Sequence, residues 1–333
     1  MQELHVTGNE AGQRLDKLLA KFLNQAPKSF LYKMMRKKNI TLNGRKCSGN
    51  EKLVAGDIVK LFFSDETIEK FSAPVSGNPV VKKAVQGKSG SRKTLDILYE
   101  DEQILLLNKP VGMLSQKAKE SDVSAVELLI EYLLSSGQLS ESQLRTFHPA
   151  VCNRLDRNTS GILVAGKTLP ALQEMSRFFK ERSIAKYYRC LVAGVVREDA
   201  YIRGYLWKNE KTNKVMILAE ERPGSVRIET EYRVLKKNTA VSLLEVHLIT
   251  GKTHQIRAHL ASAGHPMIGD YKYGNPAVNE SYRKIYGLKS QLLHAYRLEI
   301  PQSGGPLGYL SGKAFTAELP ELFAKICKDK GVM

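Results

Sequence analysis

The sequence has no run of eighteen or more apolar residues, and its first fourteen residues lack the apolar core of a secretion signal. We therefore expect a soluble, cytoplasmic protein with no membrane partner. The chain also lacks G-x-G-x-x-G and G-x-x-x-x-G-K-[ST], the glycine-rich motifs that hold dinucleotides and ATP phosphates. We accordingly expect the protein to work without a cofactor.

Cysteine is scarce, and no two cysteines form a C-x-x-C pair. Their wide spacing fits neither a zinc site nor a disulfide framework, which favours reduced thiols in a cytosolic protein. His254, His259 and His265 are close in sequence, but no cysteine or suitably placed carboxylate completes a ligand set. We therefore expect no metal site. The four cysteines are Cys47, Cys152, Cys190 and Cys327.

Acidic residues are outnumbered in this chain. It has 34 Asp and Glu against 51 Lys and Arg, a net charge of +17. A charge of this size favours a polyanionic partner, most simply nucleic acid, because each neutralised phosphate releases counterions. Residues 12–63 contain twelve basic and three acidic side chains and so carry +9 of that charge. This concentration indicates a binding face, although a generally basic surface is the alternative.

The length of 333 residues allows two domains, since one core seldom extends beyond ~300 residues. Residues 12–63 predict a small module of two amphipathic helices, the second from about Lys28 to Lys38, followed by strands around the turn Asn43-Gly44. The inner faces of the two helices are predicted at Leu15, Leu18, Leu19 and Phe22, and at Phe30, Leu31, Met34 and Met35. Residues 64–94 are rich in Pro, Gly, Ser and Lys and predict a flexible basic linker.

Residues 95–333 predict a larger domain in which strands outnumber helices. Ser124 and Thr168 are predicted to cap two helices, and two more are predicted at residues 253–263 and from residue 320. Because hairpin-length gaps often separate the strands, we expect a mixed, largely antiparallel sheet flanked by helices, which is an α+β fold. Strands are predicted at residues 97–101, 103–108, 187–196, 228–234, 242–250 and 292–300.

The segment around Asp156 has the most unusual chemistry of the chain. This carboxylate lies between Arg154 and Arg157 in a short polar turn that ends at Gly161 and leads into an apolar strand. Adjacent positive charge favours the ionised form of a carboxylate, so we expect Asp156 to be charged at neutral pH. A surface turn with an ordinary salt bridge is the alternative interpretation.

Two resemblances make these patterns specific. The N-terminal segment resembles an S4 RNA-binding domain in Arg14-Leu15-Asp16-Lys17, in residues 28–37 and in Ile40-Thr41-Leu42-Asn43-Gly44. The resemblance implies that its second helix and the next loop contact structured RNA through phosphates. The implied contacts are Lys28, Lys33, Arg36, Lys37, Lys38 and Arg45.

The larger domain resembles the RluA family of pseudouridine synthases. Four blocks carry the resemblance in the expected order: Glu100-Asp101 with residues 107–112, residues 153–161, Lys186-Tyr187-Tyr188 with Val192-Ala193-Gly194, and residues 250–257. The implied layout is a small S4-like α/β RNA-binding domain at residues 12–63 and a pseudouridine synthase domain at residues 95–333.

The family resemblance implies the residues of the active site. Asp156 matches the catalytic aspartate, Arg257 its basic partner, and Tyr188 the tyrosine that stacks on the target base. Arg154 and Arg157 match residues that hold RNA around a flipped-out uridine. Motif support is implied for Lys109, Thr159, Ser160, Gly161, Lys252, His254 and Gln255. The chain departs from the common family pattern at Asn153, where histidine is frequent, and at Lys252, where arginine is frequent.

The resemblance implies an isomerase that converts specific uridines of 23S ribosomal RNA, or of an assembly intermediate, to pseudouridine. We expect it to act as a monomer. Two alternatives stay open at this point. One is a transfer RNA pseudouridine synthase, and the other is a ribosome-assembly factor that binds RNA without catalysis.

Overall fold

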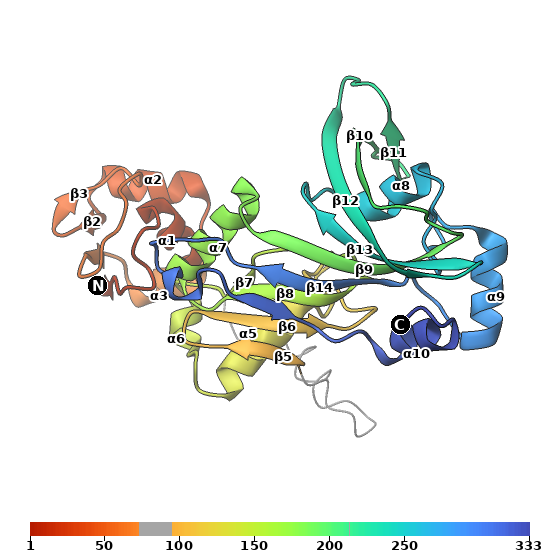
Figure 1. The fold of residues 1–333 in the computed structure, drawn as a ribbon. Helices are drawn as coiled ribbons and strands as arrows, with labels where there is room; N and C mark the ends of the chain where they lie inside the picture. The colour runs from red at the N-terminus through yellow and green to blue at the C-terminus, as the bar shows by residue number, and fades with distance from the viewer. Residues whose placement is uncertain (73–94, 213) are drawn as a thin grey trace.

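A computed structural model describes residues 1–72, 95–212 and 214–333 of the chain. Figure 1 shows a small module, which contains the amino terminus, beside a larger domain built on one long twisted sheet. No helix among the described residues is long and apolar enough to cross a lipid bilayer.

The small module packs two predicted helices, α1 and α2, against a four-stranded sheet of order β1-β4-β2-β3. Both helices form where apolar residues recur every three or four positions, and this stripe fills the core of the module. The turn from β2 to β3 has positive φ at Asn43 (50°) and Gly44 (73°), the conformation that an Asn-Gly hairpin favours. The elements are β1 (Gln2–His5), α1 (Leu15–Phe22), α2 (Lys28–Arg36), β2 (Ile40–Leu42), β3 (Arg45–Lys46), β4 (Ile58–Leu61) and α3 (Asp65–Phe71).

Two elements of the module lie outside the range predicted for it. Strand β1 precedes residue 12 and pairs antiparallel with β4. Helix α3 occupies the start of the predicted linker, so that prediction is wrong over these residues. The helix forms because Ser64 caps it and because the Phe71 ring packs 4.5 Å from the ring of Phe30 in the module core. The rest of the predicted linker, residues 73–94, lies outside the described residues.

The larger domain is built on an eleven-stranded sheet of order β11-β10-β12-β13-β9-β14-β8-β6-β5, with β15 on β14 and β7 on β8. Every pairing is antiparallel except that of β14 with β8, which confirms the predicted mixed, largely antiparallel sheet. The strands are β5 (Ile97–Glu100), β6 (Ile104–Lys109), β7 (Ala150–Val151), β8 (Ser160–Gly166), β9 (Ala185–Ala193), β10 (Ala200–Asn209), β11 (Lys214–Leu218), β12 (Ser225–Lys237), β13 (Val241–Leu248), β14 (Leu293–Glu299) and β15 (Ala314–Thr316).

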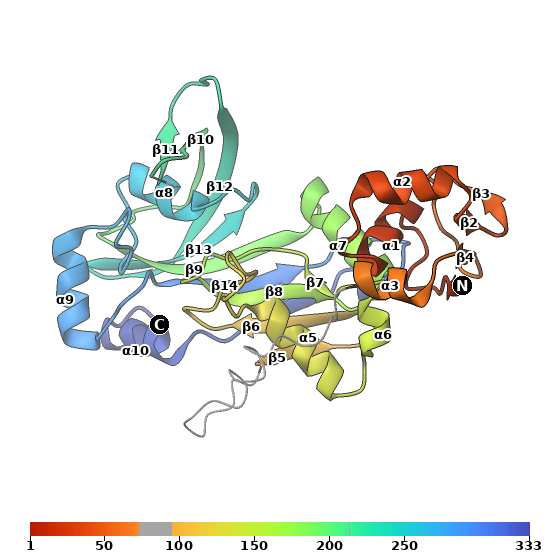
Figure 2. The same cartoon turned by 180° about the vertical axis from the view of Figure 1, so that it is seen from behind.

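Helices cover both faces of this sheet. Helix α5 packs on one face and α7 on the opposite face, each against its own apolar cluster, as the two views in Figures 1 and 2 show. Helix α8 lies against the arm formed by β10, β11 and β12, while α9 and α10 share a cluster with β9 and β13. The helices are α5 (Ala125–Ser135), α6 (Glu141–Leu144), α7 (Leu169–Glu181), α8 (Gln255–Ser262), α9 (Pro276–Tyr286) and α10 (Glu321–Asp329), with a short 3-10 turn at Gly308–Leu310.

The small module is attached to the larger domain at α6 and the start of α7. The Thr146 hydroxyl donates to Glu10 at 2.7 Å, and the Leu169 amide donates to the Asn9 side chain at 2.7 Å. The Arg145 guanidinium lies over the Phe22 ring at 4.0 Å. These contacts hold the module against one end of the sheet.

Three neighbouring strands set the position of the Asp156 turn. This turn leads into β8, whose Gly161 pairs with Ala295 of β14, and Ala295 pairs in turn with Tyr188 of β9. The backbones of β8 and β14 approach so closely that a Cβ at Gly161 would lie 2.2 Å from the Ala295 carbonyl oxygen. Position 161 therefore requires glycine, because a larger residue would separate β8 from β14. The pairing of β8, β14 and β9 brings Asp156 and Tyr188 close together.

Candidate active site

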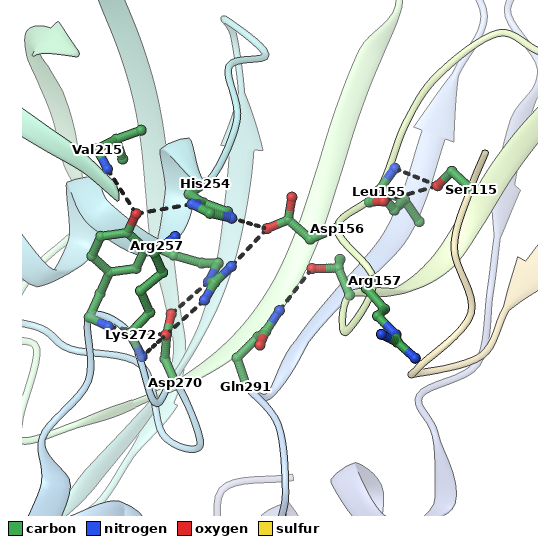
Figure 3. Close-up of polar contacts among 12 residues, drawn as sticks. Ser115, Leu155, Asp156, Arg157, Val215, His254, Arg257, Asp270, Lys272 and Gln291 are labelled. Carbon is green, nitrogen blue, oxygen red and sulfur yellow. Dashed lines mark hydrogen bonds and ion pairs between the residues drawn. The ribbon is translucent and has the colours of Figure 1, made fainter. Parts of the chain in front are cut away.

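Asp156 forms an ion pair with Arg257, a residue one hundred and one positions away in the chain. The Arg257 Nη1 lies 2.9 Å from Asp156 Oδ2, and the His254 Nε2 lies 3.8 Å from the same oxygen. The Asp156 side chain is 26% exposed, whereas Arg257 is 9% exposed. The Asp156 carboxylate is thus partly exposed, and one of its oxygens contacts the buried Arg257 guanidinium (Figure 3).

The turn that carries Asp156 is clamped on both sides of it. The Ser115 hydroxyl donates to the Leu155 carbonyl at 2.9 Å and accepts the Leu155 amide at 3.0 Å. After Asp156, the Gly112 amide donates to the Arg157 carbonyl at 2.9 Å, and Arg157 Nε returns a bond to the Gly112 carbonyl at 3.2 Å. This pattern of bonds between two loops restrains the backbone on which the carboxylate stands.

Lys109 adds a buried cation to this clamp. Its side chain is 1% exposed, and its ammonium donates to the carbonyls of Met113 (2.8 Å), Pro110 (3.1 Å) and Arg157 (3.2 Å). Burial lowers the pKa of Lys109 to about 8, against the opposing effect of the Asp156 charge. The ammonium form has one proton for each of the three carbonyls.

Replacing Lys109 by methionine therefore tests the clamp. We expect Lys109→Met to lower the free energy of unfolding by about 2 kcal/mol, because buried carbonyls lose their donor. We also expect slower turnover, because the Asp156 turn loosens. Denaturant unfolding and single-turnover rates measure the two effects, with the exposed Lys119→Met as the control. Equal stability of the two variants would contradict the clamp.

Arg257 is held by a second carboxylate, Asp270. Its Nε donates to Asp270 Oδ2 at 2.7 Å and its Nη2 to Asp270 Oδ1 at 2.9 Å, while Nη1 reaches Asp156 (Figure 3). Asp270 is 0% exposed, and the bonds from Arg257 hold its pKa below the ordinary value despite burial. The same pairing raises the pKa of Arg257, so both partners stay charged.

His254 lies on the other side of the Asp156–Arg257 pair. It has φ of +57° just before α8, and its Nδ1 lies 3.0 Å from the Tyr273 hydroxyl. That hydroxyl also accepts the Val215 amide of β11 at 3.1 Å. Burial lowers the pKa of His254, although the Asp156 charge opposes this shift, so the neutral imidazole is favoured at neutral pH.

Tyr188 lies 7% exposed on the β9 face that borders Asp156. Burial raises its pKa, and the nearby Asp156 charge adds to the shift, so the phenol stays protonated. Tyr187 faces the opposite side of the sheet, as alternation along a strand predicts, and stacks on His247 with ring centroids 4.8 Å apart. Only the second tyrosine of the pair therefore reaches the site.

These groups line a cleft of about 770 Å³, within the size range of small-ligand sites. Its floor holds Asp156, Arg257, His254 and Tyr188. The cleft is also bordered by cations, which suits a polyanionic ligand. These are Arg154, Arg157, Lys180, Arg182, Lys186 and Lys252.

The sequence of this domain matches a model of the RNA pseudouridylate synthase family over residues 103–262, a range that contains Asp156, Tyr188 and Arg257. The ribosomal large subunit pseudouridine synthase C of Vibrio vulnificus is 31% identical over 296 residues, which cover 89% of this chain and 87% of that protein. The chain belongs to the RluA family of pseudouridine synthases. It is therefore an isomerase that acts on uridine in RNA.

Other pseudouridine synthases share this likeness. The ribosomal large subunit pseudouridine synthase D of Nitrosomonas europaea is 30% identical over 306 residues, covering 91% of this chain and 81% of that protein. Among solved structures, human RNA pseudouridylate synthase domain containing 4 has a TM-score of 0.57 at 21% identity, covering 76% of this chain and 95% of that one. This structural likeness shows the fold.

The family motif positions lie where their side chains support the cleft. Thr159 Oγ1 accepts the Gln291 amide at 3.3 Å, and Ser160 Oγ lies 2.9 Å from the buried His294 Nδ1. Gln255 bonds Thr250, the Lys252 amide, the Glu229 carbonyl and Thr230, and so fixes the start of α8, the helix that carries Arg257. The Asn153 amide group bonds the backbone of Ile162 and Val164, which joins the Asp156 turn to β8.

The sequence-based expectation that Arg154 and Arg157 are the charge partners of Asp156 is wrong. Within the described residues, the basic side chains within 4.0 Å of Asp156 are the Arg257 guanidinium and the His254 imidazole, and neither Arg154 nor Arg157 is among them. Both flanking arginines are exposed, and both line the cleft without contacting the carboxylate. The guanidinium that contacts Asp156 belongs instead to Arg257 of α8.

Sequence reasoning missed Ser115, Asp270 and Tyr273. Asp270 follows Gly269 and accepts the amides of Lys272 (2.9 Å) and Tyr273 (3.1 Å), a turn that Asp commonly forms. The Gly-Asp pair was the available signal for a turn, but nothing local indicates that its carboxylate faces Arg257.

Proposed function

We propose that this pseudouridine synthase modifies uridines of large-subunit (23S) ribosomal RNA, with Asp156 as its catalytic carboxylate. The names of the similar proteins from Vibrio vulnificus and Nitrosomonas europaea support this RNA as target. The observation that carries the proposed role of Asp156 is its ion pair with Arg257 on the floor of the cleft, beside the buried Tyr188. The proposed substrate includes the same RNA within an assembly intermediate of the large subunit.

The reaction moves one bond without consuming a reactant. The N1–C1′ bond of uridine breaks, the base turns, and a C5–C1′ bond forms, while C5 loses a proton and N1 gains one. Asp156 would supply negative charge beside the ribose C1′ or the base C6, as a nucleophile or as an electrostatic partner of an oxocarbenium-like state. Its open edge faces the cleft, which supports this role.

Arg257 and Tyr188 would act on either side of that carboxylate. Arg257 donates a hydrogen bond to the Asp156 carboxylate at 2.9 Å and so fixes its position. Tyr188 would stack on the freed uracil, a contact worth ~1–3 kcal/mol for an aromatic ring and a base. Since burial raises the pKa of this phenol, its protonated form is favoured, which suits stacking and hydrogen-bond donation better than proton abstraction.

The basic rim would receive the RNA backbone around the flipped uridine. Arg154 is exposed at the cleft and would hold RNA or fill the space that the extruded base leaves in the stack. Arg157 bonds Gly112 through Nε, so its proposed contribution includes the shape of the turn. Lys252 lines the same cleft and would contact phosphate as a point charge.

The small module would provide a second RNA contact. Its six predicted RNA-binding cations are all exposed, five on α2 and the residues that follow it and one on β3. Arg14 and Tyr32 both bond Asp16, which ties α1 to α2 near this surface. These positions support, for this chain, the S4-like role that the sequence predicts. The six residues are Lys28, Lys33, Arg36, Lys37, Lys38 and Arg45.

Charge reversal tests this second contact. We expect Lys37→Glu with Lys38→Glu to weaken RNA binding at least about tenfold and to reduce the slope of log affinity against log salt by about 2, because two phosphate contacts are lost. Filter binding at several salt concentrations measures both. The matched control is Lys325→Glu with Lys328→Glu, two exposed lysines of α10. Equal losses in the two double variants would contradict a specific RNA face.

The proposed target is tested with RNA whose uridines carry tritium at C5, because the reaction releases that proton. We expect the wild-type chain to release tritium from large-subunit ribosomal RNA and not from transfer RNA transcripts. Release from transfer RNA alone would overturn the proposed target. If the purified chain releases tritium from neither RNA, and also releases none from assembly intermediates, the result would instead favour a binding protein.

A further inference from the structure

We propose that Asp270 is a positioning residue for the isomerisation, which aims the Arg257 guanidinium so that a single nitrogen, Nη1, reaches the catalytic carboxylate. This inference rests on the proposed catalytic roles of Asp156 and Arg257. It adds a second carboxylate to the site, one that never contacts the substrate.

The geometry of Arg257 leaves little choice of orientation. Asp270 receives two parallel bonds, at 2.7 Å from Nε and at 2.9 Å from Nη2, on one edge of the guanidinium. The remaining nitrogen, Nη1, then points at Asp156 Oδ2 at 2.9 Å. A bidentate pair fixes both the position and the plane of an arginine, which a single bond to a partly exposed carboxylate does not.

Asp270 is itself held rigidly. Its Oδ1 also accepts the amides of Lys272 and Tyr273, and its carbonyl accepts the Asn279 side-chain amide at 2.8 Å. Asn279 closes the turn by accepting the Gly269 amide at 2.8 Å. Helix α9 therefore positions Asp270 through the bonds of Asn279. Asp270 in turn orients the Arg257 guanidinium, which contacts Asp156.

The same arrangement divides the charge of the guanidinium. Asp270 is 0% exposed, so its pairing with Arg257 is not weakened by water, whereas Asp156 is open to the cleft. Arg257 therefore neutralises Asp270 more than Asp156, because two of its nitrogens bond Asp270 and one bonds Asp156. More of the negative charge of Asp156 is then available to the substrate. An arginine without Asp270 would be free to close on Asp156 from other directions or to leave it.

The test is a double-mutant cycle with Asp270→Asn and Arg257→Lys, read by single-turnover tritium release and by RNA affinity. We expect Asp270→Asn to lower the rate on the order of 100-fold, since small misplacements of catalytic groups cost this much, while RNA affinity changes less than about twofold. Lysine cannot make the two parallel bonds that a guanidinium makes with a carboxylate. In the Arg257→Lys background we therefore expect Asp270→Asn to lower the rate by less than about threefold. A rate loss in the double variant equal to the product of the two single losses would overturn the inference. An Asp270→Asn rate within about threefold of the wild type would also overturn it.

Asp270→Glu provides a second variant that keeps the buried charge if Asp270→Asn does not fold. It displaces the carboxylate by one methylene, so we expect at least about a tenfold slower rate with unchanged RNA affinity. A wild-type rate in this variant would overturn the inference. The control is Glu280→Gln, an exposed carboxylate on α9 that pairs with Arg283 at 2.7 Å and whose loss should leave the rate unchanged.

The outcomes separate this inference from the proposed function. A wild-type enzyme that is inactive on large-subunit ribosomal RNA contradicts the proposed target. The comparison of the Asp270 variants with the wild type is then made on the RNA that the wild type does modify, so the positioning role is tested in either case.

Discussion

Asp156→Asn is expected to abolish turnover while leaving RNA binding nearly unchanged. The rate of tritium release should fall by a factor on the order of 10⁴ or more, because removal of a nucleophile or of its charge has effects of this size in other enzymes. The amide keeps the size of the carboxylate and can still accept a bond from Arg257, which lies 2.9 Å away. The turn is held by Ser115, Lys109 and Gly112 and not by the carboxylate, so the fold should persist.

Affinity measured by filter binding separates this result from a folding defect. We expect the Asp156→Asn protein to bind RNA within about twofold of the wild type, because most of the affinity comes from phosphate contacts. Asp65→Asn, the same change at an exposed position of α3, serves as the control and should retain full activity. A variant that still releases tritium at a tenth of the wild-type rate would exclude the proposed role of Asp156.

Gly161→Ala is expected to have the largest effect on stability. A Cβ at this position would lie 2.2 Å from the Ala295 carbonyl oxygen and 2.6 Å from the Ala295 amide nitrogen, which are backbone atoms at the centre of the sheet. Strands β8 and β14 would have to separate, and the residue also has φ of +107°, which L-residues rarely adopt. We expect the free energy of unfolding to fall by at least about 3 kcal/mol.

Gly194→Ala isolates the contribution of backbone conformation. Gly194 has φ of +86°, but its Cβ would meet no atom within 4 Å. Its replacement should therefore cost only about 1 kcal/mol, the cost of a left-handed conformation. Urea unfolding of the two variants measures the difference. Losses of equal size would show that the close approach of β8 to β14 contributes nothing.

Local patterns predicted the elements whose cause is local. The capping box of Ser124 and Glu127 marks the start of α5, and Thr168 followed by Pro170 marks the start of α7, as the structure confirms. Tyr187 and Tyr188 alternate across their strand, and Tyr188, which the family resemblance implied, is the one that lines the cleft. In each case the physical signal, a cap or a period of two, lies within a few residues of the feature.

Contacts between distant segments were beyond such patterns. Strand β10 was missed because Gly204 interrupts its apolar side, and its buried residues pack on β11, β12 and α8 rather than on a neighbour in sequence. Likewise, sequence proximity suggested Arg154 and Arg157 as the partners of Asp156, whereas the sheet brings Arg257 there. Only the folded chain shows that Asp270 holds this arginine.

We propose that this chain isomerises uridines of large-subunit ribosomal RNA through Asp156. Mapping pseudouridines in ribosomal RNA from cells whose chain carries Asp156→Asn tests it most directly. We predict that one or more pseudouridines of the large-subunit RNA disappear and return when the wild-type chain is restored. A pseudouridine pattern identical to that of wild-type cells would contradict the claim.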